Sequence, residues 1–379
     1  MKTQNEMTAI YKKRRANFAT WLARQGTGAM IFIDSEEHRS PSIRYFTGHP
    51  QDAVLCIAVD GSSVLIPWDE ILASKIACVE YVIPYTRYER QEVKAAAGAL
   101  KKLKVPANSR VEIPGSTPYP DFLKFVDGLS EFDVICRENG GEQEAANMRA
   151  IKDEYEISCI EKAAEITDKL IDTIEAGVKD GTIKTEMDAA LLIERECRAA
   201  GCEGTGFDTL AAGPARSFGI HCFPNYTAGE FPAQGLSILD FGVIYNGYTS
   251  DVTITVAKGP LSEAQEKQLA LVQKAYDECL GLYAKDIPVK AASQKADDVF
   301  AKAKRTMPHS LGHGIGLECH EAPGIRLRAP QECVFKPGMV VTLEPGLYDD
   351  AIGGCRLEND ILITEDGNKV LTHARIIRI

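Results

Sequence analysis

The chain has 379 residues, of which 45% are hydrophobic and 26% charged, and its formal net charge at neutral pH is −11. The composition is that of an ordinary globular protein, and the length predicts two domains. The acidic balance argues against nucleic acid and anionic membranes as partners, since the strongest basic run is the short KKRR at 12–15. No run approaches the ~20 apolar residues that span a membrane. The N-terminal segment lacks the apolar core of a signal peptide, and the 11 cysteines are dispersed without a CxxC pair, so we expect reduced thiols in a cytoplasmic protein.

The first part of the chain alternates apolar β-like runs with amphipathic helical stretches, which predicts an α/β domain over 1–140. His38 and His49 lie in loop-like stretches of it and are predicted to be surface residues. The predicted helices cover 8–25, 89–104 and 119–129, and the predicted strands 29–33, 43–48, 54–59, 64–66, 110–113 and 133–136.

The remainder, 141–379, combines longer helices with strand pairs and predicts a second domain. An apolar stripe that includes Ile151 predicts the first of its helices, and Ser262 to Gln265 forms a capping box for the third. The predicted helices cover 148–176, 185–200, 262–283 and 293–304.

Two aspartates lie in a predicted β-hairpin of this second part. Two β-like runs flank Asn246-Gly247, which is a strong signal for a two-residue turn. Such a turn places Asp240 opposite Thr253, with Asp251 two residues along on the same face, roughly 7–8 Å away between backbones. Aspartate is depleted in strands and costly to bury unpaired, so the two carboxylates either face solvent on an edge strand or converge on cations.

The segment 309–321, HSLGHGIGLECHE, holds three of the chain's seven histidines, His309, His313 and His320. Its three closely spaced glycines argue against a helix and predict a strand-like segment where the backbone approaches another group closely. Neutral imidazole is the commonest metal ligand and proton carrier. The segment therefore predicts a metal site that takes its oxygen ligands from elsewhere.

Two glutamates lie in a second strand pair. A predicted strand ends at Glu344, and its return strand carries Glu358, with Arg356 and Asp360 on the same face. Glu344 and Glu358 could face each other, although the loop leaves the register open. With the hairpin aspartates they make four carboxylates, which would repel one another without metal and which two divalent cations would balance.

In this order the residues resemble the five metal ligands of the creatinase, prolidase, aminopeptidase P and methionine aminopeptidase superfamily. The sequences LDFG, SDVT, GHGIGLECHEAP, TLEPGLY and RLEND carry the resemblance over 148–379, and 1–140 is loosely similar to the creatinase-type N-terminal domain. The resemblance implies an α/β creatinase-like domain, 1–140, and an α+β pita-bread catalytic domain, 141–379. The latter would be a curved antiparallel sheet covered by helices, with pseudo-twofold symmetry.

The resemblance also implies how the ligands divide between two divalent metal ions. Asp251 and Glu358 would bridge the ions, Asp240 would hold one of them, and His313 and Glu344 the other. A metal-bridging hydroxide would then be the nucleophile that hydrolyses the Xaa-Pro amide bond of a small peptide.

Further residues are similar to the family's catalytic groups. Glu344 resembles the general acid/base, and His221, His309 and His320 resemble histidines that bind the scissile carbonyl or the tetrahedral intermediate. Arg356 resembles a residue that orients the carboxylates.

The resemblance leaves the specificity open. Gly324 stands where prolidases often have an arginine for a dipeptide's carboxylate, and Arg326 and Arg328 are the nearest alternatives. A dipeptidase and an aminopeptidase both remain possible, as does hydrolysis of a small non-peptide amide, in the manner of creatinase or ectoine hydrolase. A non-catalytic binding protein on the same fold is disfavoured because the ligand set is complete. An oxygen-rich set with one histidine favours manganese, with cobalt, zinc or iron as alternatives, and the resemblance implies a homodimer.

Overall fold

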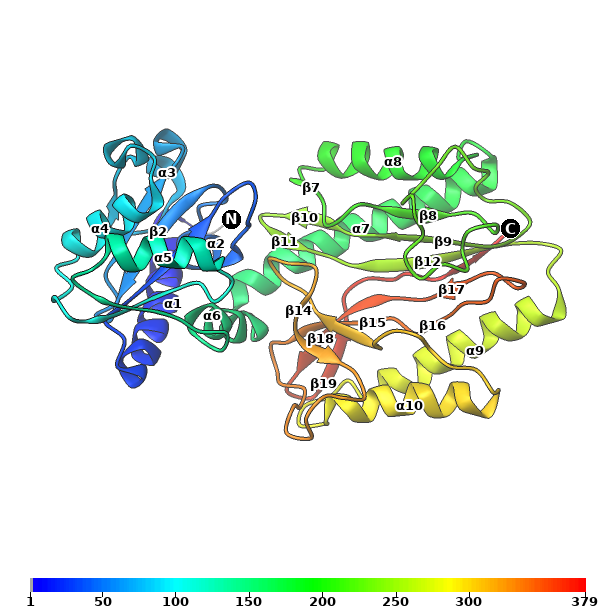
Figure 1. The fold of residues 1–379 in the computed structure, drawn as a ribbon. Helices are drawn as coiled ribbons and strands as arrows, with labels where there is room; N and C mark the ends of the chain where they lie inside the picture. Colours follow the sequence, from blue (N-terminus) through cyan, green and yellow to red (C-terminus); the bar gives the residue numbers. More distant parts are fainter. Residues whose placement is uncertain (1–2) are drawn as a thin grey trace. The chain divides into compact units, whose positions relative to one another are not determined.

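The computed structural model describes residues 3–379. The chain divides into two compact units, Met1–Met148 and Arg149–Ile379, which are coloured blue to green and green to red in Figure 1. The division by domains, 1–140 and 141–379, stays a prediction. Among residues 3–379 no helix has the length and apolar character needed to cross a membrane.

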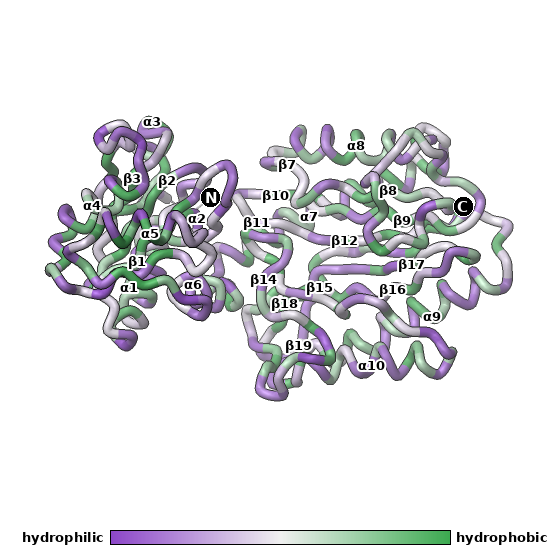
Figure 2. Tube along the Cα trace, viewed as in Figure 1, coloured by the Kyte–Doolittle hydropathy of each residue, from purple (hydrophilic) through white to green (hydrophobic). Residues whose placement is uncertain are grey.

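The first unit is built on a six-stranded sheet of order β4-β3-β2-β1-β5-β6. β1 pairs antiparallel with β2 and parallel with β5, so the sheet is mixed. Its central strands are almost wholly buried and form green segments in Figure 2. The strands are β1 (Ala29–Asp34), β2 (Ala53–Ala58), β3 (Ser63–Pro67), β4 (Tyr81–Val82), β5 (Arg110–Ile113) and β6 (Asp133–Cys136), and the helices are α1 (Gln4–Gln25), α2 (Pro41–Thr47), α3 (Glu70–Ile76), η1 (Tyr85–Tyr88), α4 (Glu92–Lys102) and α5 (Tyr119–Gly128).

The prediction of a strand over 43–48 is wrong, because this segment forms the helix α2. Pro41 begins the helix, where its fixed φ suits the first turn and its missing N–H costs nothing. Gly48 ends it in the left-handed conformation, at φ 79°. These two terminal signals outweigh the β propensity of the apolar residues between them.

The prediction of a surface position is confirmed for His38, which is exposed, and wrong for His49, which is fully buried. His49 follows Gly48, and a Cβ at Gly48 would lie 3.0 Å from the Tyr11 hydroxyl, so this turn packs beneath α1 instead of facing water. Burial lowers the pKa of His49, which keeps its imidazole neutral.

The second unit contains two main sheets. One has the order β20-β12-β9-β8 and the other β14-β13-β15-β18-β19. An isolated bridge between Thr253 and Glu358 connects the two. All pairs are antiparallel except β12 with β20, where the C-terminal strand lies parallel. The strands are β7 (Gly204–Thr205), β8 (Leu210–Ala212), β9 (Gly235–Phe241), β10 (Val243–Tyr245), β11 (Tyr248–Thr249), β12 (Val252–Lys258), β13 (Gly312–Gly314), β14 (Glu321–Ile325), β15 (Val340–Leu343), β16 (Gly346–Leu347), β17 (Cys355–Arg356), β18 (Asn359–Thr364), β19 (Gly367–Val370) and β20 (Ile376–Arg378).

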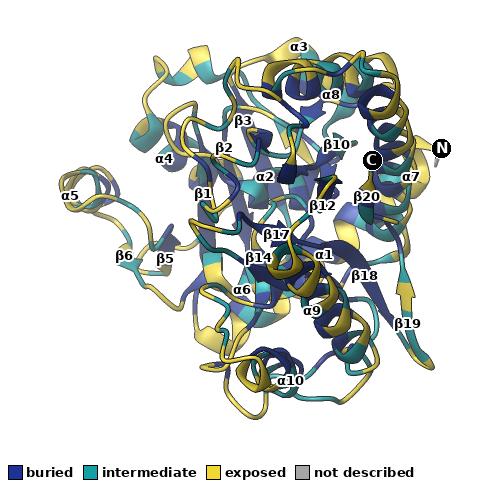
Figure 3. Ribbon diagram, turned by 90° about the vertical axis from the view of Figure 1, so that its right-hand side faces the viewer, coloured by how far each residue is buried: buried dark blue, intermediate teal, exposed yellow. Residues whose placement is uncertain are grey.

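Helices cover the sheets of the second unit. α7 (Glu154–Asp180) packs on β10 and β11, and α8 (Glu186–Ala199) on β7 and β8, while α9 (Glu263–Leu280) packs on β15–β17 and α10 (Val289–Lys302) on β14. In Figure 3 most strands of this unit are dark blue, β19 is teal and yellow, and α7, α9 and α10 each turn an exposed side outward. The strands beside the candidate residues are therefore buried.

The predicted single helix over 148–176 is wrong at its start. The chain forms α6 (Gly141–Ala150), turns at Ile151, and begins α7 at Glu154. Asp153 caps α7 in a capping box with Glu156, and this local signal interrupts the apolar periodicity that Ile151 had suggested. The other three predicted helices are confirmed, with α10 beginning earlier than expected.

The predicted hairpin register is confirmed, because Asp240 pairs with Thr253. In the other sheet Leu343 pairs with Asn359, so Glu344 and Glu358 occupy the next opposed positions beyond the ladder. The return strand is split into β17 and β18 at Glu358, whose backbone N–H donates instead to the Thr253 carbonyl, 3.1 Å away.

Candidate metal centre

One pocket of the second unit, with a volume of about 570 Å³, brings the candidate residues together. Its walls come from β8, β9, β13, β14 and β17 and from loops, including the residues just before β12 and just after β15. They include all eight residues to which the sequence assigns a metal or catalytic role: His221, Asp240, Asp251, His309, His313, His320, Glu344 and Glu358.

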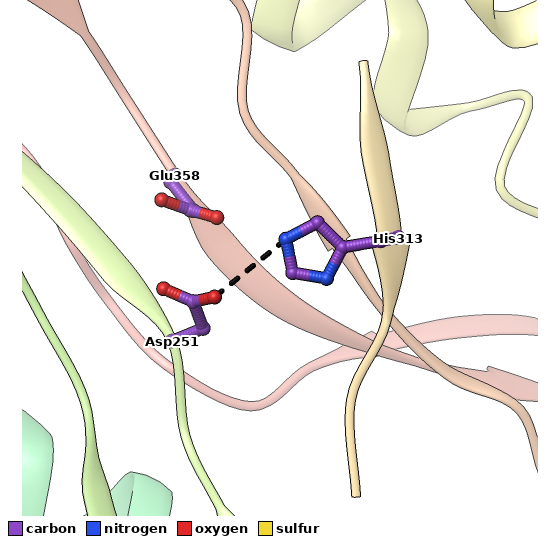
Figure 4. A group of neighbouring side chains, drawn as sticks. All are labelled: Asp251, His313 and Glu358. Carbon is purple, nitrogen blue, oxygen red and sulfur yellow. Dashed lines mark ion pairs between the residues drawn. The ribbon is translucent and has the colours of Figure 1, made fainter. Parts of the chain in front are cut away.

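Three of these side chains form the centre of the cluster. Ligand atoms of Asp251, His313 and Glu358 all lie within 4.8 Å of one another. Figure 4 shows the His313 ring pointing from β13 toward the two carboxylates, with its Nε2 3.7 Å from Asp251 Oδ2. Three donors at this spacing could share one cation.

The His313 ring is held with one nitrogen facing the carboxylates. Its Nδ1 lies 3.1 Å from the Gly314 carbonyl and donates to it, which leaves the Nε2 lone pair facing Asp251 and Glu344. Nε2 lies 3.5 Å from Glu344 Oε1. Burial lowers the pKa of His313 to about 4, so the ring is neutral at pH 7, as a metal ligand must be.

The glycines beside His313 allow the close strand packing that the sequence predicted. A Cβ at Gly312 would lie 2.1 Å from the Thr342 carbonyl oxygen, and one at Gly314 would lie 2.2 Å from the Ala322 carbonyl oxygen. A side chain at either position would separate β13 from β15 or β14, and would shift His313 with it.

Asp240 is connected to the other carboxylates by hydrogen bonds of Arg356. The Arg356 Nη2 donates to Asp240 Oδ2 at 2.5 Å, while the buried Asp240 Oδ1 has no hydrogen-bond partner within residues 3–379. Arg356 Nε also donates to Thr253 Oγ1, which donates in turn to Glu358 Oε2. Arg356 thus orients two carboxylates, and the unpartnered oxygen of Asp240 is available to a cation.

The electrostatics of the cluster call for added positive charge. Burial and the neighbouring carboxylates raise the pKa values of Asp251 and Glu344 well above normal, and that of Glu358 to about 8. Arg356 alone does not offset four acids. These residues therefore fit divalent cations, because bound metal would allow every carboxylate to ionise.

The three remaining histidines lie at the pocket wall. His221 and His320 are exposed, and the His320 ring lies 4.3 Å from that of His313, measured between centroids. His309 is half-buried, with its Nδ1 3.7 Å from Glu344 Oε2. Two of these imidazoles are therefore accessible to solvent at the pocket wall.

Tyr348 is a residue whose place in the site the sequence reasoning missed. Its hydroxyl accepts from Arg356 Nη1 at 2.5 Å and donates to His309 Nε2 at 3.0 Å. Its position at the end of the TLEPGLY motif was the available signal. Tyr348 links the guanidinium that orients Asp240 to the imidazole beside Glu344.

The cysteines near the site differ in their surroundings. Cys222 and Cys355 are buried in hydrophobic clusters, whereas Cys319 lines the pocket and donates to Asp251 Oδ2 at 3.1 Å. All 11 cysteines are free thiols in this structure.

A half-buried imidazole and four carboxylates, three of them buried, meet in one pocket, which is the donor set of a metal-binding protein. The family model Metallopeptidase family M24 matches residues 158–365. The Xaa-Pro dipeptidase of Pyrococcus horikoshii is 32% identical over 341 residues, which cover 88% of this chain and 91% of that protein. The chain therefore belongs to metallopeptidase family M24, and it is a metallo-exopeptidase.

Solved structures agree with this assignment over both units. The prolidase from Pyrococcus horikoshii superposes with a TM-score of 0.82 at 27% identity, covering 96% of this chain and 99% of that one. The Xaa-Pro dipeptidase from Bacillus anthracis has a TM-score of 0.82 at 26% identity and covers 97% and 100%. The predicted family and the predicted fold, an α/β N-terminal part with a pita-bread catalytic part, are confirmed.

Proposed function

We propose that this protein hydrolyses the Xaa-Pro amide bond of short peptides with two divalent cations. The observation that carries the proposal is the convergence of five donor side chains in one pocket with an excess of buried carboxylates. Asp251 and Glu358 would bridge the two cations, with Asp240 on one, and His313 and Glu344 on the other. Bound there, the cations would activate a bridging hydroxide as nucleophile and polarise the scissile carbonyl.

The chain's own residues would handle protons and the developing charge. Glu344, whose pKa is raised by burial and by Glu358, would accept a proton on its carboxylate and return it to the departing proline nitrogen. His221 and His320, exposed at the wall, would donate hydrogen bonds to the oxygen that gains charge. His309 would support Glu344, because its Nδ1 lies 3.7 Å from Glu344 Oε2 and its ring is held by Ser310 and Tyr348.

One further observation favours a substrate with a free carboxylate close to the scissile bond. Arg326 lines the pocket, and its guanidinium carbon lies 3.8 Å from the place where a Cβ on Gly324 would be. Within residues 3–379 no carboxylate forms an ion pair with it, whereas Arg356, the other arginine of the pocket, is engaged by Asp240 and Tyr348. We therefore propose a dipeptidase, in which Arg326 takes the position that the absent arginine at 324 would hold.

The test compares Ala-Pro with Ala-Pro-Ala after the metal is removed and replaced by manganese, cobalt or zinc. We expect cleavage of Ala-Pro. Arg326→Met should raise its KM about 10–100-fold with little change in kcat, since a charged hydrogen bond contributes about 1.5–3 kcal/mol to binding. Arg328→Met, which alters an exposed neighbour, is the matched control and should leave KM unchanged.

Each contrary result has a distinct meaning. If only Ala-Pro-Ala is cleaved, the protein is an aminopeptidase and the dipeptidase proposal is wrong. No cleavage of either peptide with any of the three metals would contradict the peptidase proposal and favour a small non-peptide amide as substrate.

The remaining properties are proposals with separate measurements. An oxygen-rich donor set with one imidazole favours manganese over cobalt, zinc and iron, which metal analysis of the purified protein tests. A homodimer is tested by light scattering, and a cytoplasmic location by cell fractionation. The net charge of −11 predicts no binding to nucleic acid.

A further inference from the structure

A buried ion cluster lies outside the lining of the pocket and outside the set of candidate ligands. Glu321 Oε1 accepts a hydrogen bond from Arg149 Nε at 2.9 Å, and Glu321 Oε2 accepts one from Lys152 Nζ at 3.1 Å. The side chains of Glu321, Arg149 and Lys152 are 1%, 5% and 0% exposed. Arg149 also reaches Glu318 Oε2, at 2.5 Å. We call these four residues the Glu321 clamp.

The acidic side of the clamp supports the loop between β13 and β14. The Glu321 carboxylate lies directly over Gly316, where a Cβ would be only 2.5 Å from it. The same carboxylate accepts the Glu318 backbone N–H at 3.4 Å. The loop 315–321 is therefore closed around this single buried anion.

That loop carries two groups into the pocket. Cys319 donates to Asp251, and His320 places its ring 4.3 Å from that of His313. His320 directly precedes Glu321 in the chain, so a displacement of the carboxylate would displace the imidazole. The clamp does not line the pocket, and it acts on the site through this neighbour.

The cationic side of the clamp comes from the segment where the chain passes from one compact unit to the other. Arg149 is the first residue of the second unit, and Lys152 lies in the turn between α6 and α7. The Lys152 N–H also donates to the Gly338 carbonyl at 2.9 Å, just before β15. The junction segment is thus fixed to the second unit by both backbone and side chains.

The charges of the clamp depend on one another. Burial alone would raise the pKa of Glu321, but attraction to Lys152 and Arg149 outweighs it, so the pKa lies below its usual value. A buried charge that loses its partner is poorly solvated, and the surrounding structure must rearrange to reach water or another partner. Removal of one cation should therefore move Glu321 and the loop attached to it.

We propose that Arg149 and Lys152 are positioning residues that set the orientation of His320 through Glu321, so that the segment joining the two units controls turnover. The idea rests on the proposed function, because His320 is taken there as a group that contacts substrate. It adds that Arg149 and Lys152, which are far from His320 in the sequence and lie at the junction of the two units, affect kcat.

The experiment uses Lys152→Met in the metal-loaded full-length protein. We expect bound metal and KM to stay within about twofold of the unaltered protein, while kcat falls about 10–100-fold, as is usual when a partner that orients a site residue is lost. Lys152→Arg, which keeps the charge, should recover most of the kcat. The control is Arg137→Met, which breaks an ion pair with the buried Glu112 in the first unit and should leave kcat unchanged.

A double-mutant cycle separates positioning from a general loss of stability. In a His320→Ala background, Lys152→Met should cause little further loss of kcat, because the group through which it acts is absent. An equal further loss in that background would overturn the proposal. Should Lys152→Met fail to fold, Arg149→Gln, which leaves Lys152 on Glu321, is measured with the same expectations.

Amide hydrogen exchange gives a readout that does not depend on activity. Peptides covering 315–321 should exchange faster in Lys152→Met than in the unaltered protein, with no change in peptides from α9. Unchanged exchange in this loop would overturn the clamp even if Xaa-Pro hydrolysis is established. Faster exchange in a protein that cleaves no Xaa-Pro peptide would support the clamp and reject the proposed function.

Discussion

Removal of metal should give this protein an unusual dependence of stability on pH. Glu358 has a pKa of about 8 in the metal-free fold, because burial and Asp240 oppose its ionisation, against an ordinary value of 4.5. Between those values the unfolded chain has lost a proton that the folded chain keeps. The folded state therefore becomes less stable as pH rises through this window.

The size of the effect follows from the shift. Each pH unit inside the window removes about 1.4 kcal/mol for one such group, and the loss lessens near its folded pKa, so Glu358 alone should cost about 1 kcal/mol between pH 7 and 8. Asp251 and Glu344, whose pKa values are also raised, act in the same direction. His309 and His313 have pKa values of about 4 in the fold, so they make the folded state less stable as pH falls below 6.5. They change the stability little between pH 7 and 8.

The assay is urea unfolding of chelated protein at pH 7.0, 7.5 and 8.0, repeated with a divalent cation. The free energy of unfolding should fall with pH in the chelated protein and should not fall in the loaded one, where ionised carboxylates bind metal. Glu358→Gln should remove its share of the dependence. A chelated protein whose stability is constant or rises from pH 7 to 8 would show that the carboxylates are not crowded as described.

Three substitutions test other parts of the site. Asp251→Ala should abolish metal binding and activity together, and two metals still bound in the purified variant would refute the ligand assignment. His320→Ala should keep its metal and lose mainly kcat, so a variant that loses metal would move His320 into the ligand set. Gly312→Ala should destabilise the fold by about 1–3 kcal/mol and weaken metal binding, because its Cβ would meet the Thr342 carbonyl. Gly281→Ala, with no atom within 4 Å of the added methyl, is the control in thermal unfolding.

Much of the site could be read from the sequence where local rules apply. Asn246-Gly247 fixes a two-residue turn, and side-chain alternation then places Asp240 opposite Thr253 without further information. The glycines around His313 likewise predicted an extended segment at a close backbone contact, which β13 and its neighbours confirm. Turn geometry and the alternation of side chains along a strand are set by a few neighbouring residues. The rest of the fold can therefore change them little.

Other features were decided by contacts between distant parts of the chain. Glu358 leaves its strand to pair with Thr253 in the other sheet, and no local pattern indicates that bridge. His49 is buried because α1, which lies far from it in the sequence, packs on the turn before it.

The sequence by itself determined which side chains could bind metal, since the types and local spacing of its acids and histidines are written in the chain. The tertiary structure decided how they are oriented and supported, through Arg356 between Asp240 and Thr253, and through Lys152 and Arg149 on Glu321. The physical reason is that a buried charge is stable only beside its partner, and that partner can come from any part of the chain that the fold brings near.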